Sequence, residues 1–487
     1  MRQLYERGAD NETLFALLNA SYAVVRNGSE ILIANVVGKD VILMKVENLH
    51  KIYANVRVKV GNDFVEVSRP WFKWKGRRQY LGRGITFEPH GPLEVPDDRL
   101  NLWRGFGIEP KQGDWSLLRN HIFNIICSGN QTHFDYLIRW AAFTVQHPNE
   151  PIGVALAFRG AQGAGKGVVA RTLGKIFGKH FAHIADGNQL TGRFNAGLAT
   201  SCLVFLDEAL WAGDKKGEGV LKALITEPRL QLEAKFRDPI MVDNHSHIIV
   251  ASNNDWFVPA GMGDRRWFIL KVADTFAGTD HSEYWKPLYR EIENGGAEAM
   301  FYDLLNMDLS TFDVRAVPPT GAKAQQQAHS LRGTEAWLFD ALQEGAIAGE
   351  CWQISGLTVT KDNAYDHYEE FSKRQRDWRP DGKSVWSKKI FERLGSCVQG
   401  ARQKDAGERV RVFKFAPLAD CWRKFEAHIP NIEWEEPNNE PELVPSPNVV
   451  TPDEVSPPEV SPPDGAYADS PAQGADELGK SAWRGTL

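Results

Sequence analysis

A glycine-rich loop that ends in lysine is the part of this sequence best suited to chemistry. It reads Gly160-Ala161-Gln162-Gly163-Ala164-Gly165-Lys166-Gly167, between an apolar run at 154–158 and a helix-like segment that begins at Val168. Glycines let successive backbone N–H groups turn toward one phosphate, and the lysine ammonium and the N-terminus of the next helix add positive potential. Residues 160–168 are therefore predicted to bind the phosphates of ATP.

The loop departs from the usual pattern at its last position. Gly167 stands where a serine or threonine commonly offers a hydroxyl to Mg²⁺, and Val168 has no hydroxyl either. Mg²⁺ must then depend on other ligands. Adenylate kinase-like proteins share the Gly-Lys-Gly ending, so a small-molecule or nucleotide kinase is an alternative.

Two adjacent carboxylates, Asp207 and Glu208, follow the apolar run 202–206. Such a run is typical of a strand buried in a parallel sheet. We expect Asp207 to hold Mg²⁺ and Glu208 to orient or deprotonate an attacking water. This pair favours hydrolysis over transfer to a substrate hydroxyl.

Further polar groups lie beside the next predicted strands. Asn253 follows the apolar run 247–251, where its amide can contact the γ-phosphate, although Asn253-Asn254-Asp255 is equally consistent with a plain turn. Arg265 and Arg266 precede the last apolar run of the region. A guanidinium offered to a phosphate on a neighbouring subunit is an arginine finger.

The ordered series of the loop, Asp207-Glu208, Lys235, Ser252-Asn253 and Asp264-Arg265-Arg266 resembles superfamily 3 helicases. More narrowly, the chain is similar to the helicase portion of primase-helicase proteins from phages and mobile elements. The similarity covers roughly residues 17–270, with a weaker match beyond, and implies a P-loop, AAA+-like ATPase core.

The resemblance also implies a role for each matching residue. Lys166 would contact phosphate, Asn253 would sense the γ-phosphate, and Arg265 would be the finger, with Arg266 as the alternative. Lys235, together with Arg237, would contact DNA.

As a whole, the resemblance implies an ATP- and Mg²⁺-dependent DNA helicase that forms a homo-oligomeric ring, expected to be a hexamer, on single-stranded or forked DNA. No primase or polymerase module is recognised before Leu17, so we expect a separate primase or polymerase as partner. Besides the kinase, a non-catalytic scaffold that binds nucleotide and DNA is a second alternative.

Composition limits the class of protein. No apolar run approaches the roughly 18 residues that span a bilayer, and the first residues do not resemble a signal peptide, so we expect no membrane contact and a cytoplasmic location, in a bacterial host if a phage encodes the chain. Five dispersed cysteines without a C-x-x-C pair indicate neither disulfides nor zinc. The net charge of −6 hides an acidic tail, because residues 431–487 carry −10 and the remainder +4.

Hydrophobic periodicity predicts an α/β protein with a three-layer nucleotide-binding core. In residues 71–80, basic and aromatic side chains alternate, which fits either a surface that stacks on single-stranded DNA or an ordinary domain surface. The predicted division is an α+β accessory module at 1–90, a helical segment at 91–150, the ATPase core at 151–280, a helical connector at 281–330, a basic winged-helix-like domain at 331–430 and a disordered, Pro-rich acidic tail at 431–487.

Overall fold

The computed structural model describes most of residues 5–434. Excluded from this range are residues 7, 83, 96–97, 188–189, 191–195, 210–214, 233–239, 262, 279–280, 376–378, 406–407 and 433. Within the described part, no helix has the length and apolar character needed to cross a membrane.

A five-stranded parallel sheet lies at the centre of the predicted core. Its strands follow the order β11-β12-β15-β10-β16. Because all five are parallel, their carboxyl ends lie along one edge. This confirms a mixed α/β architecture with a parallel sheet. The strands are β10 (Ala155–Arg159), β11 (Phe181–Ile184), β12 (Leu203–Asp207), β15 (His247–Ser252) and β16 (Trp267–Lys271).

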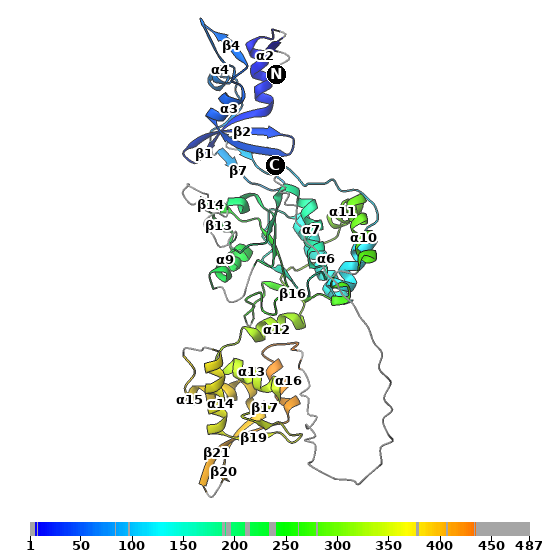
Figure 1. The fold of residues 1–487 in the computed structure, drawn as a ribbon, viewed down its shortest axis with the longest axis vertical. Coiled ribbons are helices and arrows are strands. Elements are labelled where there is room, and N and C mark those ends of the chain that lie inside the picture. The colour runs from blue at the N-terminus through cyan, green and yellow to red at the C-terminus, as the bar shows by residue number, and fades with distance from the viewer. Residues whose placement is uncertain are drawn as a thin grey trace, which may run out of the picture. The chain divides into compact units, whose positions relative to one another are not determined.

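Helices cover both faces of this sheet (Figure 1). Alternate residues of a strand point to opposite faces, so Leu156 and Phe158 pack with one helical layer while Ala155 and Ala157 pack with the other. The first layer comprises α5 (Ser116–His121), a π-helical turn (Ile122–Ile126), α6 (Gln131–Gln146), α7 (Lys166–Phe177), α10 (Ser282–Glu291) and α11 (Ala297–Leu305), and the second contains α9 (Lys215–Thr226).

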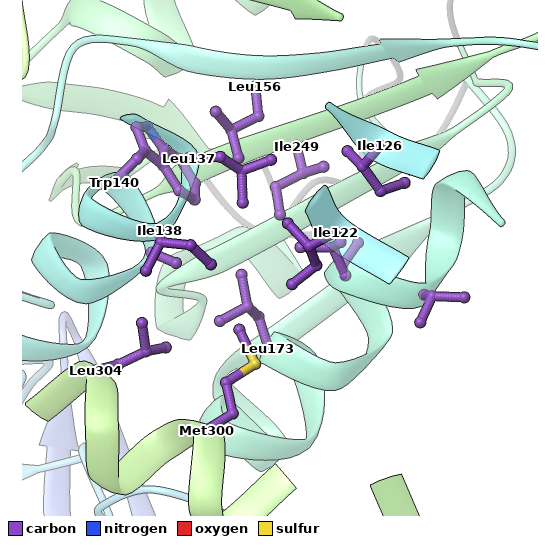
Figure 2. Close-up of a cluster of buried hydrophobic side chains, with 14 of the residues drawn as sticks. Ile122, Ile126, Leu137, Ile138, Trp140, Leu156, Leu173, Ile249, Met300 and Leu304 are labelled. Atoms are coloured by element: carbon purple, nitrogen blue, oxygen red, sulfur yellow. The ribbon is translucent and has the colours of Figure 1, made fainter. Parts of the chain in front are cut away.

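The first layer forms a large apolar cluster on the sheet. Figure 2 shows its side chains converging from α6, α7, α11 and the strands, with Ile122, Ile126, Leu137, Ile138, Trp140, Leu156, Leu173, Ile249, Met300 and Leu304 labelled. This cluster fixes α7, and hence the glycine-rich loop, against β10.

Replacing Leu137 with alanine is expected to lower the free energy of unfolding by about 2–5 kcal/mol, because the side chain is fully buried and its loss leaves a cavity. Leu117→Ala is the matched control, since that leucine is 43% exposed. Urea denaturation measures both. Equal effects of the two substitutions would contradict this packing.

The N-terminal residues form a four-stranded sheet in the order β3-β2-β1-β6 with small adjoining sheets. Trp71 is fully buried, and its Nε1 donates to Asn19 Oδ1 at 2.9 Å, so this tryptophan of the basic aromatic segment packs in the core rather than offering its ring to DNA. The elements are α2 (Asn11–Ser21), β1 (Tyr22–Asn27), β2 (Glu30–Val37), β3 (Asp40–Lys45), α3 (Val46–Ile52), β4 (Arg57–Val60), β5 (Asp63–Glu66), α4 (Ser68–Lys73), β6 (Gln79–Tyr80), β7 (Gly84–Thr86), β8 (Glu94–Val95) and β9 (Arg99–Asn101).

The region after α11 forms helices and short strands around an apolar cluster of its own. Its elements are α12 (Gly321–His329), α13 (Thr334–Glu344), β17 (Ala346–Ile347), β18 (Glu350–Cys351), β19 (Leu357–Thr360), α14 (Lys361–Arg374), α15 (Lys383–Leu394), β20 (Val398–Asp405), β21 (Glu408–Phe415) and α16 (Leu418–Glu426). Strands β19, β21 and β20 form one antiparallel sheet.

Candidate functional site

The glycine-rich loop joins the carboxyl end of β10 to the N-terminus of α7, as predicted. Gly163 and Gly165 take φ values of 81° and 90°, in the left-handed region that glycine enters without steric cost. Gly165 directly precedes α7, so the unpaired N–H groups of the first helical turn open toward the loop. This backbone is suited to an anion such as phosphate.

Lys166 begins α7 and is only 7% exposed. Its Nζ donates to Gly160 O at 2.7 Å and to Ala161 O at 2.8 Å, so the ammonium is held against the loop. Burial lowers the pKa of Lys166, and nearby carboxylates, with Glu208 the strongest, act in the opposite direction. A phosphate would supply the counter-charge that this buried ammonium lacks.

Asp207 lies at the end of β12, on the same sheet edge as the loop, because β12 pairs with β15 and β15 pairs with β10. Its Oδ2 accepts from Arg171 Nη2 at 3.1 Å and from His183 Nε2 at 3.2 Å. Within the described residues, Oδ1 has no hydrogen-bond partner. Oδ2 is thus held by two hydrogen bonds, while Oδ1 is available to bind another group.

Glu208 follows with a φ of 56°, although it is not a glycine. Its N–H donates to Ala251 O at 2.9 Å, and its side chain is exposed. A left-handed conformation costs such a residue about 1–3 kcal/mol and is concentrated at functional sites.

One cavity of about 680 Å³ brings the predicted loop and carboxylates together. Its volume lies in the usual range for small-molecule sites. Two aromatic residues from α10 form part of its wall. The lining residues are Gln162, Gly163, Gly165, Lys166, Gly167, Val168, Arg171, Ala185, Asp207, Glu208, Gly278, Trp285 and Tyr289.

Asp274 is a contact that the sequence analysis missed. It follows β16, and its Oδ1 accepts from the Ala161 N–H at 3.0 Å. The parallel pairing of β16 with β10 carries this carboxylate to the start of the loop. A polar residue just past a predicted strand was the available signal, the same signal that identified Asp207.

His121 and Trp285 pack over Gly165. An added Cβ at Gly165 would lie 2.6 Å from His121 Cε1 and 2.6 Å from Trp285 Cη2. His121 Nδ1 also lies 2.9 Å from the Tyr284 hydroxyl, and burial lowers the pKa of His121 to about 4, so the imidazole is neutral near pH 7. These contacts leave the loop no room for a side chain at position 165.

Gly165→Ala is therefore expected to destabilise the fold by about 2 kcal/mol or more and to abolish nucleotide binding, because it combines a left-handed φ with overlap. Gly219→Ala is the control: it lies within α9, and among the described residues no non-neighbouring atom lies within 4 Å of its added Cβ. Thermal unfolding and ADP titration check both variants. A stable, ADP-binding Gly165→Ala protein would contradict the loop geometry.

Arg265 and Arg266 lie at the opposite edge of the sheet from the loop. The Ala155 N–H donates to Arg266 O at 2.8 Å, at the start of β10, and the five residues of that strand span about 16 Å. Arg266 Nε is bound to Asp264 Oδ1 at 3.0 Å. Arg265 is exposed and has no ion-pair partner in the part of the chain that is described. Neither arginine is close to the loop of its own chain.

Three further residues were predicted to contribute to function, and the structure describes one of them, Asn253. Asn253 is exposed just beyond β15 and is absent from the cavity wall. Lys235 and Arg237 lie outside the described residues, in the segment that connects β13 (Arg229–Leu232) to its antiparallel partner β14 (Ile240–Asp243).

Comparisons with known proteins find a matching family model and a relative from a phage. Residues 158–266, which include the loop and Asp207-Glu208, match a family model described as a family of unknown function (DUF5906). The chain is 32% identical over 234 residues to the DNA primase-polymerase of Nitratiruptor phage NrS-1. That alignment covers 44% of this chain and 30% of the relative, so it spans about a third of the relative's length.

Solved structures show the same fold. The apo NrS-1 C-terminal region matches with a TM-score of 0.54 and 19% identity over 82% of this chain and 97% of that one. A second apo form of this region gives a TM-score of 0.55 and 18% identity, covering 84% and 100% of the two chains. The similarity in fold therefore extends beyond residues 158–266, and the chain resembles a phage primase-polymerase in part of its sequence.

Proposed function

We propose that this chain is an ATP-dependent DNA helicase subunit of the superfamily 3 type, with a P-loop, AAA+-like core, acting in replication of phage or mobile-element DNA in the bacterial cytoplasm. The observation that carries the proposal is that Lys166, Asp207 and Glu208 line the same cavity. We retain the predicted domain division as part of the proposal, with a primase or polymerase as the expected partner.

The residues present fit Mg²⁺. Within the described residues, no three His, Cys, Asp or Glu side chains gather as a metal cage. Mg²⁺ usually binds through one or two carboxylates together with substrate phosphates, and Asp207 with its available Oδ1 offers that kind of ligand. When bound, the ion would neutralise charge that develops on the phosphoryl group.

Residues on two sides of the cavity would act together in ATP hydrolysis. Lys166 and the loop N–H groups would hold the phosphates, and Glu208 would orient or deprotonate the attacking water. Neither Arg265 nor Arg266 can be a finger for the cavity of its own chain, because both lie at the far edge of the sheet. In a ring, Arg265 would reach the nucleotide of the neighbouring subunit, which explains why an exposed arginine lacks an ion-pair partner in the described part.

The proposed DNA contacts include the hairpin that β20 and β21 form. Arg402 lies directly opposite Arg411, and Lys404 opposite Arg409, and all four side chains are exposed. Like charges placed directly across an antiparallel pair are destabilising. A nucleic-acid backbone would relieve that repulsion. Lys235 and Arg237, between β13 and β14, stay the proposed contacts to single-stranded DNA.

Strand displacement tests this function. The chain, with ATP and Mg²⁺, is expected to separate a forked DNA duplex, and native mass spectrometry with nucleotide is expected to show a six-subunit assembly. Lys166→Ala is the control that should not separate the strands. A monomer that transfers phosphate to a small acceptor would instead establish a kinase, and ATP binding without turnover would establish a scaffold.

A further inference from the structure

Gly167 leaves a space that another side chain of the same helix fills. Arg171 follows Gly167 by four residues on α7, so the two share a helix face, and long side chains of a helix lean toward its N-terminus. A Cβ at Gly167 would lie 3.4 Å from Arg171 Cζ and 3.5 Å from both Nε and Nη2. The guanidinium therefore lies against the position of the missing side chain.

The same guanidinium is bound to the predicted metal ligand. Arg171 Nη2 donates to Asp207 Oδ2 at 3.1 Å, and both residues line the cavity. The N-terminal end of α7 and the Arg171 guanidinium both favour negative charge nearby. Asp207 supplies part of it, and a bound polyphosphate would supply more.

We propose that Arg171 is a positioning residue that replaces the missing hydroxyl at position 167. By holding Oδ2 of Asp207, it directs Oδ1 toward the nucleotide phosphates and their Mg²⁺. The inference rests on the proposed function, because it requires that the cavity bind Mg²⁺ with a nucleotide. It goes beyond that function because it gives Arg171, a residue outside the glycine-rich loop, a role in positioning Asp207.

The ion pair contributes little to folding, which makes the proposal testable. The Arg171 side chain is 58% exposed, and ion pairs between exposed side chains contribute little to stability. Arg171→Ala should therefore fold normally, with an unchanged melting temperature. The matched control is Lys175→Ala, which removes an exposed positive charge one turn further along α7.

The experiment is calorimetric titration of the full chain with ADP, with Mg²⁺ or with EDTA. Arg171→Ala is expected to weaken ADP binding about tenfold or more with Mg²⁺ and less than about threefold in EDTA, as for partners that orient metal ligands. In the Gly167→Ser background, where the hydroxyl is restored, Arg171→Ala should cost less than about threefold. Lys175→Ala should change neither affinity.

Two results would overturn the inference while leaving the proposed function intact. One is an equal loss of affinity in Mg²⁺ and in EDTA, which would mean that Arg171 does not act through Asp207 and the metal. The other is an equal effect of Arg171→Ala with Gly167 and with Gly167→Ser. If the unchanged chain failed to bind ADP under either condition, the inference and the proposed function would both be wrong.

Discussion

Replacement of Lys166 with alanine is expected to reduce ATP hydrolysis by a factor of about 10²–10³, the usual cost of deleting one group that stabilises transition-state charge. The ammonium is buried, is held by Gly160 O and Ala161 O, and lies beside Glu208 and Asp207. Alanine removes the only side-chain cation that the loop itself contributes. The measurement is steady-state phosphate release at saturating ATP.

Lys222→Ala is the control for Lys166→Ala. Lys222 lies on α9 and is ion-paired with Glu218 one turn earlier, as in an ordinary solvated helix pair. Its loss should leave turnover unchanged. Retention of more than about a tenth of the activity by Lys166→Ala, in a protein that melts normally, would contradict the phosphate-binding role of the loop.

Arg265→Ala is expected to have the larger effect, a loss of about 10³-fold or more in turnover with ADP affinity unchanged, as for other arginine fingers. The reason is the position of Arg265: it is exposed at the edge of the sheet opposite the loop, and under the proposed function it would act on a neighbour's nucleotide. Arg266→Ala removes the ion pair with Asp264 and should mainly reduce stability.

Mixing subunits tests whether Arg265 acts across an interface. Neither Arg265→Ala nor Glu208→Gln should hydrolyse ATP alone, but mixed rings contain interfaces where an intact Arg265 faces an intact Glu208. Partial recovery of turnover on mixing is therefore expected. Mixtures that stay as inactive as the separate variants would show that the two residues do not form a shared site.

The loop and the carboxylate pair could be predicted from sequence because their signals are local. Each consists of a few residue types next to a short apolar run, and the strand and helix that position them are the flanking residues themselves. The structure brings Lys166, Asp207 and Glu208 to one cavity because the parallel strands that precede them end at a common edge.

Other contacts depend on which strands pair with each other, and a short sequence pattern does not show this pairing. Asp274 reaches Ala161 across 113 residues because β16 pairs with β10. His183 reaches Asp207 because β11 pairs with β12. Arg171 is different: its four-residue spacing from Gly167 on a predicted helix was visible, and the absence of a side chain at Gly167 was the signal.

The distinction between core and surface was equally hard to read from composition. Trp71 belongs to a stretch of alternating basic and aromatic residues, yet the structure buries it. Burial depends on which elements pack against the segment, and here the partner is Asn19 on α2, 52 residues earlier. The assignments of Lys235 and Arg237 to DNA stay predictions.

We propose that this cavity hydrolyses ATP and that DNA controls the rate of hydrolysis. The most direct measurement is the rate of ATP hydrolysis by the full chain with Mg²⁺, in the presence and absence of single-stranded DNA. We expect turnover that single-stranded DNA increases several-fold and that Lys166→Ala abolishes. Turnover that is indifferent to DNA, or that persists in Lys166→Ala, would contradict it.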